Sequence, residues 1–228
     1  MNRHIRSLDT VTAAELALVG TKTVGVVGAG GLGGYVIEML ARFGVGTLKI
    51  IDGDVFDESN LNRQLLSTEA NLGKVKVDAA ALRVITINSN VQTETFYEVF
   101  NSENAETFLH DVDVAVDCLD NVTARLLLER RCAAHNIPLV HGAVGAWSGQ
   151  VMTVLPGDDA LRKLYGDEML PASSQTAASF IPATIASYQV AECIKLLIGR
   201  GELLRHRMMY FDLLHNNNFI VDLKEEAQ

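Results

Sequence analysis

The feature that most constrains the fold of this chain is a glycine cluster between two apolar segments. It reads Gly28-Ala-Gly-Gly-Leu-Gly33, follows the apolar residues 23–27 and opens an amphipathic stretch at 31–44. A strand, a tight turn and a helix explain this order. Gly28 permits the turn, Gly30 lets the backbone approach an anion, and Gly33 lets the helix pack close to the strand. The backbone amides at the helix N-terminus are therefore predicted to bind phosphate.

Apolar strand patterns alternate with helical patterns through the first half of the chain, which predicts parallel strands. We expect an α/β fold with a Rossmann-like, mostly parallel sheet, helices on both faces and antiparallel strands extending it. Residues 1–228 are predicted to form one domain, and 157–178 lack a persistent period and are expected to be a mobile crossover. The predicted strands lie near 23–28, 47–52, 91–97, 112–118, 138–142, 149–155 and 208–213, and the predicted helices near 12–19, 31–44, 73–87, 123–136 and 178–199.

Two acidic residues follow the second predicted strand. Asp52 comes about 20 residues after the glycines, where a carboxylate accepts hydrogen bonds from a ribose hydroxyl, and Asp54 lies beside it. Up to this point a nicotinamide dinucleotide would fit as well as a nucleoside triphosphate.

A polar segment and a later lysine favour the triphosphate. Ser59, Asn60, Arg63 and Lys76 supply donors and two cations that a dinucleotide's pyrophosphate does not require. Arginine offers a planar fork to phosphate oxygens, while lysine acts as a compact point charge. Ser59 and Asn60 could equally cap a helix, because both residue types are common at helix N-termini.

Asp120 and Asn121 follow a further apolar strand pattern at 113–119. The carboxyl ends of parallel strands meet at one edge of a sheet, where ligands bind. A carboxylate beside a triphosphate is a natural magnesium ligand, so Asp120 is the predicted metal residue. The alternative role of Asp120 is to cap the helix that begins near Thr123.

These clusters together resemble the nucleotide site of the ThiF/MoeB/HesA family, relatives of the ubiquitin-activating enzymes. The similarity continues beyond them and covers most of the chain. It implies ATP- and magnesium-dependent adenylylation of the C-terminal glycine of a small ubiquitin-fold protein, commonly a sulfur carrier, with release of pyrophosphate. The matching motifs are the glycine cluster, Asp52-Gly-Asp54, Ser59-Asn-Leu-Asn-Arg-Gln64, Lys76 and Asp117-Cys-Leu-Asp120-Asn.

The resemblance also implies the roles of individual residues. Arg63, Lys76, Asp120 and Arg6 would be catalytic, with magnesium on Asp120. Arg6 belongs to an Arg-x-x-Arg motif whose second arginine, in relatives, reaches the site of the partner subunit, which implies a homodimer. A flexible basic N-terminus is the competing interpretation of this motif. The residues expected at the nucleotide are Gly28, Gly30, Gly31, Gly33, Asp52, Asp54, Ser59, Asn60, Arg63, Lys76, Asp120 and Asn121.

The cysteines depart from the family pattern. Many relatives carry paired zinc cysteines after the position of Pro156, and this chain reads Ala160-Leu-Arg-Lys163 there, so no structural zinc is expected. Thioester-forming relatives carry a nucleophilic cysteine in the segment that corresponds to 171–178, which has none here. The sequence contains Cys118, Cys132 and Cys193, all in apolar patterns typical of a core. We therefore predict that the chemistry stops at the acyl-adenylate.

The composition excludes several classes of partner. The net charge is -9 and the sequence has no Lys/Arg cluster, which argues against nucleic acid as a partner. We identify no apolar run near the ~20 residues that span a bilayer and no apolar signal core at the start, so we expect no membrane association. Scattered cysteines fit a reducing compartment, and a cytoplasmic location is expected.

Three alternatives remain open from the sequence. A nicotinamide-dependent oxidoreductase would use the glycine cluster and Asp52 but leave Arg63 and Lys76 without a role. A nucleotide-binding scaffold would use the same site without turnover. An adenylyltransferase of the same superfamily could act on a short peptide or on a base of transfer RNA.

Overall fold

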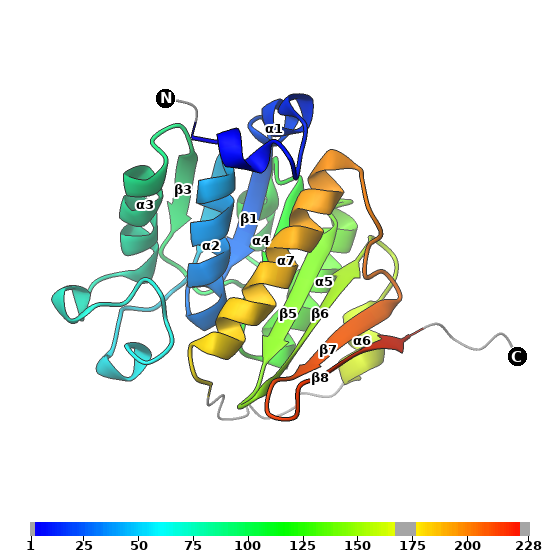
Figure 1. Ribbon diagram of the computed structural model, residues 1–228. Coiled ribbons are helices and arrows are strands. Elements are labelled where there is room, and N and C mark those ends of the chain that lie inside the picture. The colour runs from blue at the N-terminus through cyan, green and yellow to red at the C-terminus, as the bar shows by residue number, and fades with distance from the viewer. Residues whose placement is uncertain (1–2, 167–176, 224–228) are drawn as a thin grey trace, which may run out of the picture.

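The computed structural model describes residues 3–166 and 177–223, and one eight-stranded sheet runs through this part of the chain (Figure 1). The strand order is β3-β2-β1-β4-β5-β6-β7-β8. Strands β3 to β5 in that order pair in parallel, and β5 to β8 pair antiparallel. The bounds are β1 Thr23–Val27, β2 Thr47–Ile51, β3 Gln92–Phe96, β4 Val114–Asp117, β5 Leu139–Val144, β6 Ser148–Val154, β7 Arg207–Asp212 and β8 Asn217–Asp222.

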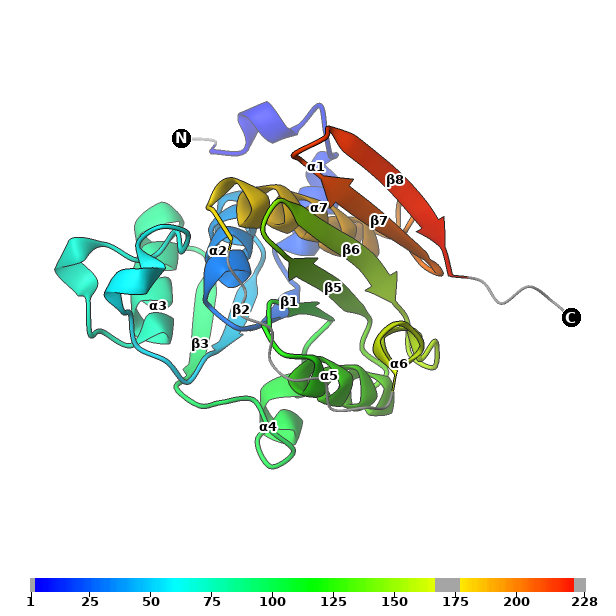
Figure 2. The ribbon, with the colours of Figure 1, turned by 90° about the horizontal axis from the view of Figure 1, so that it is seen from below.

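Helices cover both faces of the sheet (Figure 2). One face carries α2 (Gly31–Phe43), α3 (Lys76–Ile87) and α7 (Phe180–Ile198), with α1 (Ala13–Val19) beside α7. The other face carries α4 (Ala105–Leu109), α5 (Val122–Ala134) and α6 (Ala160–Tyr165). Short 3₁₀ turns are η1 (Ile5–Ser7), η2 (Glu58–Asn60) and η3 (Glu69–Asn71). The Rossmann-like fold class predicted from the sequence is confirmed.

The central strands are apolar on both sides because helices cover both sides. In β1, Val24 and Val26 join the core beneath α2 and α7, whereas Val27 joins the core beneath α5. In β4, Val114 and Ala115 divide in the same way. Successive side chains of a strand point to opposite faces, so a continuous apolar run builds two cores at once.

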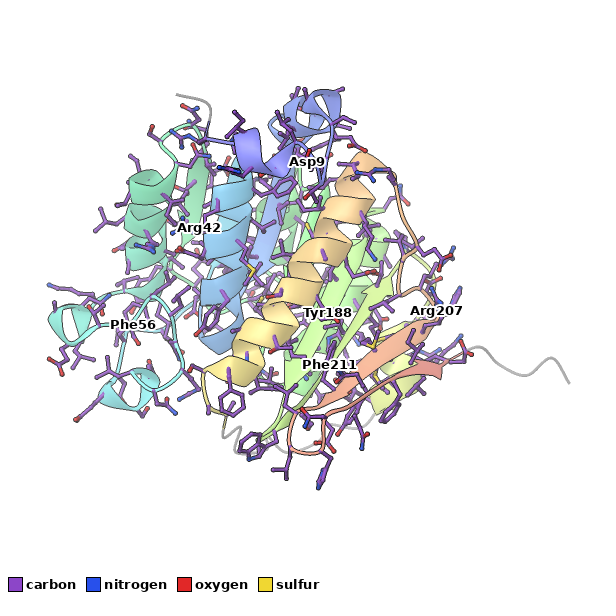
Figure 3. All side chains as sticks on the ribbon, viewed as in Figure 1. Asp9, Arg42, Phe56, Tyr188, Arg207 and Phe211 are labelled. Carbon is purple, nitrogen blue, oxygen red and sulfur yellow. The ribbon has the colours of Figure 1, made fainter. Side chains whose placement is uncertain are left out.

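Helix α7 differs from the expectation that no segment approaches a bilayer span. Phe180–Ile198 is long and apolar enough to cross a membrane by length and composition, and 56% of its 18-residue apolar window is buried inside the structure. It packs against α2, β5 and β6. Tyr188 of α7 also meets Phe211 of β7 edge-on, with ring centroids 4.6 Å apart (Figure 3). The apolar character of this helix therefore serves the core of the domain.

Besides the 3₁₀ turns, two α-helices and one strand of the described residues were absent from the sequence prediction. These are α4, α6 and the edge strand β8. Within the predicted crossover at 157–178, Ala160–Tyr165 forms α6. Glu129 accepts hydrogen bonds from the amides of Leu161 and Arg162 and so holds the first turn of this helix. Residues 167–176 of that crossover lie outside the described residues.

Candidate active site

A cleft of about 500 Å³ opens at the carboxyl ends of β1, β2 and β4. Side chains and backbone from several separate segments surround it, among them the acidic residues Asp52, Asp54 and Asp120 and the cations Arg63 and Lys76. The lining residues include Gly28, Gly30, Gly31, Asp52, Asp54, Arg63, Gln64, Lys76, Cys118, Leu119, Asp120 and Asn121. The structure thus brings together most of the residues that the sequence predicted for one site.

Two glycines of the loop are required by the protein's own backbone. Gly28 has φ +99°, and a Cβ there would lie 2.7 Å from the carbonyl oxygen of Cys118. A Cβ on Gly33 would lie 1.8 Å from the carbonyl oxygen of Gly28. These contacts confirm the tight turn and the close packing of the helix against the strand. Gly33 itself packs inside the fold and does not line the cleft.

Gly30 and Gly31 have a different environment. The nearest atom to a Cβ on Gly30 would be 3.6 Å away, and to one on Gly31 it would be 3.7 Å away. Both residues line the cleft at the N-terminus of α2, where unpaired amides favour an anion. The space in front of them suits a phosphate group.

Asp52 ends β2 and fixes the glycine loop. Its Oδ2 accepts a hydrogen bond from the Ala29 amide at 2.7 Å, and its Oδ1 accepts one from the Asp54 amide at 2.8 Å. Each carboxylate oxygen has a further lone pair, so the side chain can still accept a hydrogen bond from a ribose hydroxyl in the cleft.

Lys76 is a buried cation with an acidic partner. It is the first residue of α3 and only 5% exposed, and its Nζ lies 2.8 Å from Oδ2 of Asp54, whose side chain is 68% exposed. The Lys76 amide also donates to the Asp54 carbonyl at 3.1 Å. An anion beside a buried ammonium stabilises its charge. The pair therefore keeps a charged lysine in the wall of the cleft.

The segment before Arg63 corrects part of the prediction. Ser59 and Asn60 do not line the cleft. Asp57, not Ser59, caps η2: its Oδ1 accepts from the Ser59 amide at 2.8 Å, while Oδ1 of Asn60 accepts from the Asp57 amide at 3.1 Å. Neither Ser59 nor Asn60 is therefore the N-cap, although the side chain of Asn60 is buried and takes part in the capped turn. A contact of these two residues with the nucleotide stays a prediction.

The η2 turn positions Arg63 at the cleft. Its Nη1 donates to the Ser59 carbonyl at 2.7 Å and to Oδ1 of Asn62 at 3.0 Å. A guanidinium has five N–H donors, so donors remain for a phosphate.

Gln64 is a cleft residue that the sequence analysis missed. It is 6% exposed, lies beside Gly30, and has an Oε1 that is buried without a hydrogen-bond partner among the described residues. Its position directly after Arg63 is the sequence feature that could have identified Gln64 as a cleft residue. Buried polar atoms without partners are rare in folded proteins.

Asp120 and Asn121 lie just beyond the end of β4. Asn121 caps α5, since its side-chain oxygen accepts from the Ala124 amide at 2.8 Å, so the alternative capping role of Asp120 is wrong. Asp120 is exposed in the cleft. Over residues 3–166 and 177–223 no group of three His, Cys, Asp or Glu could hold a metal alone. One carboxylate suits Mg²⁺, which takes its other ligands from phosphates and water.

Arg6 lies at the opposite end of the domain. His4 packs against Gly44 at the C-terminal end of α2, and Arg3 donates to the carbonyl of Ile87 at the end of α3. Helix α2 has 13 residues, and at about 1.5 Å per residue it separates this segment from the cleft by about 20 Å (Figure 1). Arg6 is therefore not part of the cleft of its own chain.

The three cysteines are separate and buried. Cys118 reaches the cleft wall, but burial raises the pKa of its thiol well above the ordinary value, and the Asp117 carboxylate adds to that shift. Burial likewise raises the pKa values of Cys132 and Cys193. Because the thiolate is the reactive form, these thiols are poor nucleophiles at neutral pH.

Comparison with known proteins identifies the family. Residues 1–228 match the ThiF family over the whole chain. The chain belongs to the ThiF family. Among curated relatives it is 34% identical over 218 residues to the SAMP-activating enzyme E1 of Haloferax volcanii, which is 93% of this chain and 80% of that protein. It is 35% identical over 206 residues to the adenylyltransferase and sulfurtransferase MOCS3 of Arabidopsis thaliana, covering 87% of this chain and 44% of that protein. This ThiF family member thus spans less than half the length of its MOCS3 relatives.

Solved structures share the fold. E. coli MccB with ATP superposes with a TM-score of 0.80 at 20% identity, over 99% of this chain and 72% of that chain. PaaA superposes with a TM-score of 0.81 at 24% identity, over 97% of this chain and 72% of that chain.

Proposed function

We propose that this chain is an adenylyltransferase that activates the C-terminal glycine carboxylate of a small ubiquitin-like sulfur-carrier protein with ATP and magnesium. The observation that carries the proposal is the cleft that combines the glycine loop, Arg63, Lys76 and Asp120. Membership of the ThiF family and similarity to an E1 and to MOCS3 adenylyltransferases support it.

The proposed reaction needs no general base. A C-terminal carboxylate is ionised at neutral pH, so one of its oxygens attacks the α-phosphorus directly. The bond from the α-phosphorus to the oxygen that bridges to the β-phosphate breaks, and pyrophosphate departs with the bonding electrons. The products are an acyl-adenylate and pyrophosphate, so atoms and charge balance.

The protein's residues bind and orient the reactants. The α2 amides at Gly30 and Gly31 hold a phosphate, and Asp52 accepts from the ribose. Lys76 and Arg63 stabilise the charge that develops on the departing pyrophosphate, a task of position and electrostatics. Asp120 would hold magnesium, which supplies further neutralisation of phosphate charge when bound.

In this proposal the reaction ends at the acyl-adenylate without a thioester. The raised pKa values of the described cysteines and the absence of cysteine from 171–178 support that limit. No zinc has a structural role in this proposal. Neither a nucleic acid nor a membrane is a partner in it. The chain would act in the cytoplasm as a homodimer, with Arg6 serving the cleft of the second copy. The distance of Arg6 from its own cleft supports that arrangement.

Carrier-dependent exchange of labelled pyrophosphate into ATP tests the proposal. Asp120→Ala is expected to abolish exchange while the melting temperature stays unchanged. Asp78→Ala is the matched control, because Asp78 is an exposed aspartate in the first turn of α3 that does not line the cleft. Retention of exchange by Asp120→Ala would remove Asp120 from the mechanism. Mass spectrometry of a candidate carrier after incubation with ATP identifies the acyl-adenylate directly.

The nicotinamide alternative is tested by thermal shift. Family membership favours ATP over a dinucleotide, so ATP with magnesium is expected to raise the melting temperature and NAD is not. Stabilisation by NAD alone would contradict the proposed function. A scaffold would bind ATP without exchanging pyrophosphate. An enzyme for a peptide or an RNA base would show exchange only with that substrate.

A further inference from the structure

A buried polar cluster lies directly behind Asp120, the acidic residue that is exposed in the cleft. Asp117 and His141 are 0% exposed and Arg125 is 4% exposed. Asp117 ends β4, His141 lies on the neighbouring strand β5, and Arg125 lies on α5. Tyr165, the last residue of α6, completes the group, and Figure 2 shows α5 and α6 side by side on this face of the sheet.

The cluster holds both polar groups of the backbone at Leu119, the residue before Asp120. The Leu119 amide donates to Oδ1 of Asp117 at 2.9 Å. The Leu119 carbonyl accepts from Nη2 of Arg125 at 2.6 Å. On its other side, Asp120 adjoins Asn121, which is fixed as the cap of α5. The turn that presents Asp120 to the cleft is therefore anchored at both ends.

Further hydrogen bonds hold Asp117 and Arg125 themselves in place. The Tyr165 hydroxyl accepts from Nη1 of Arg125 at 3.3 Å and from Nε2 of Gln150 at 2.7 Å. A phenol can also donate once, so it donates to Nε2 of His141 at 3.1 Å. His141 is then neutral and donates from Nδ1 to Oδ2 of Asp117 at 2.7 Å.

The cluster is costly to bury. Nε of Arg125 is buried without a hydrogen-bond partner in the described part of the chain and lies 3.6 Å from Oδ2 of Asp117. Buried ion pairs are weak evidence for stability, because apolar residues of similar volume often serve as well. Rotation of the Cys118–Leu119 peptide would break the hydrogen bond to Asp117, and rotation of the Leu119–Asp120 peptide would break the one from Arg125. We therefore assign the cluster the role of fixing the backbone at Leu119 beside the cleft, rather than that of stabilising the fold.

We propose that Asp117 and Arg125 are positioning residues that orient Asp120 toward magnesium-bound ATP through the two backbone peptides that flank Leu119, with His141 and Tyr165 holding them. This inference rests on the proposed function, because it assigns Asp120 its ligand. Neither Asp117 nor Arg125 lines the cleft, so both act through the backbone.

Arg125→Lys is the variant that tests this role. Lysine keeps the positive charge beside Asp117 but has no guanidinium fork to reach both the Leu119 carbonyl and the Tyr165 hydroxyl. Titration calorimetry with a non-hydrolysable ATP analogue at a series of magnesium concentrations gives a readout independent of turnover. The magnesium concentration for half-maximal binding is expected to rise about tenfold, with binding of the analogue in the absence of magnesium unchanged.

A second variant and a control make the test decisive. Tyr165→Phe removes only the hydroxyl and should shift the magnesium dependence in the same direction by about two- to threefold. Glu192→Gln is the control, since Glu192 is a buried carboxylate that accepts from the Leu204 amide away from the cleft. It is expected to lower the melting temperature and leave the magnesium dependence unchanged. If Arg125→Lys does not fold, the Tyr165→Phe result decides.

Two outcomes overturn different statements. If Asp120→Asn weakens magnesium-dependent binding while Arg125→Lys and Tyr165→Phe do not, the positioning role is wrong and the proposed function stands. If Asp120→Asn also leaves that binding unchanged, the metal role of Asp120 in the proposed function fails as well. An equal shift in Glu192→Gln would show a general effect of destabilisation and would contradict positioning.

Discussion

Acidic residues have different environments in the parallel and antiparallel halves of the sheet. At the end of parallel strands β1, β2 and β4, acidic residues border an open cleft, as Asp52 and Asp120 do. Beside the antiparallel half, the buried carboxylates of Glu192 and Asp158 are satisfied by partners within the protein. Glu192 accepts from Thr153 at 2.5 Å and from the Leu204 amide at 2.8 Å, and Asp158 pairs with Arg205 at 2.8 Å.

Strand direction explains this difference. Parallel strands end on the same edge of a sheet, so the loops that follow them diverge and leave a crevice. Antiparallel strands end alternately on opposite edges and are closed by hairpins, such as the one between β7 and β8. Substitutions of the charged cleft residues should therefore affect nucleotide chemistry, and substitutions of these buried carboxylates should affect folding stability.

Among the substitutions that compare the two halves, the largest expected effect is on catalysis at Lys76. Lys76→Ala removes a cation from the cleft and leaves its exposed partner Asp54 in contact with water. Carrier-dependent pyrophosphate exchange should fall by about 10²- to 10³-fold, as when one transition-state donor is removed. The melting temperature should change little. An exchange rate near that of the wild type would contradict a role for Lys76.

Substitutions at two glycines of one loop should change folding stability and nucleotide binding separately. Gly33→Ala places a Cβ 1.8 Å from the carbonyl oxygen of Gly28, and it should reduce the free energy of unfolding by about 3 kcal/mol or more. Gly31→Ala meets no atom closer than 3.7 Å, so the fold should persist while nucleotide affinity falls. Chemical denaturation and calorimetry measure the two effects. Equal stability of both variants would contradict the packing role of Gly33.

The antiparallel half should show the opposite pattern. Glu192→Gln disturbs the buried hydrogen bonds to Thr153 and Leu204, so the free energy of unfolding should fall by about 1–3 kcal/mol. The rate of pyrophosphate exchange at a temperature where the variant is folded should equal that of the wild type. A large loss of pyrophosphate exchange in the folded variant would contradict the proposed difference between the two halves.

The smallest expected effect is a pH dependence at the junction of the two halves. Burial lowers the pKa of His141 below its ordinary value of 6.5, although the Asp117 carboxylate opposes this shift. The unfolded chain therefore binds a proton more readily, and stability falls as pH drops below about 6.5, by at most about 1.4 kcal/mol per pH unit. Denaturation of the wild type and His141→Gln between pH 7.5 and 5.5 measures it. Identical slopes would exclude His141 as the source.

Much of the fold was predictable because strong local patterns produced it. The predicted strands at 23–28 and 47–52 correspond to β1 and β2, and the predicted helix at 31–44 corresponds to α2. The missed strand β8 has mostly exposed residues, so no apolar alternation marks it; only pairing with β7 makes it a strand. Helix α6 was missed because Glu129, about 30 residues earlier in the chain, supplies contacts to its first turn.

The sequence predicted which residues gather at the cleft, but it did not predict the contacts that they make. The strand patterns placed Asp52 and Asp120 at the carboxyl ends of strands, and charge together with the family resemblance added Lys76. The sequence did not predict that Asn60 would be buried in a capped turn, or that Gln64 would lie beneath the glycine loop.

The amino-acid sequence by itself determined the parallel core, the glycine turn and the kinds of charge at the cleft, because each follows from short-range periodicity and from the stereochemistry of single residues. Only the tertiary structure decided which of those charges face the cleft and which are bound to the protein's own backbone. That choice depends on residues distant in the chain, such as Asp117, His141 and Tyr165, whose hydrogen bonds form only when their strands and helices pack together.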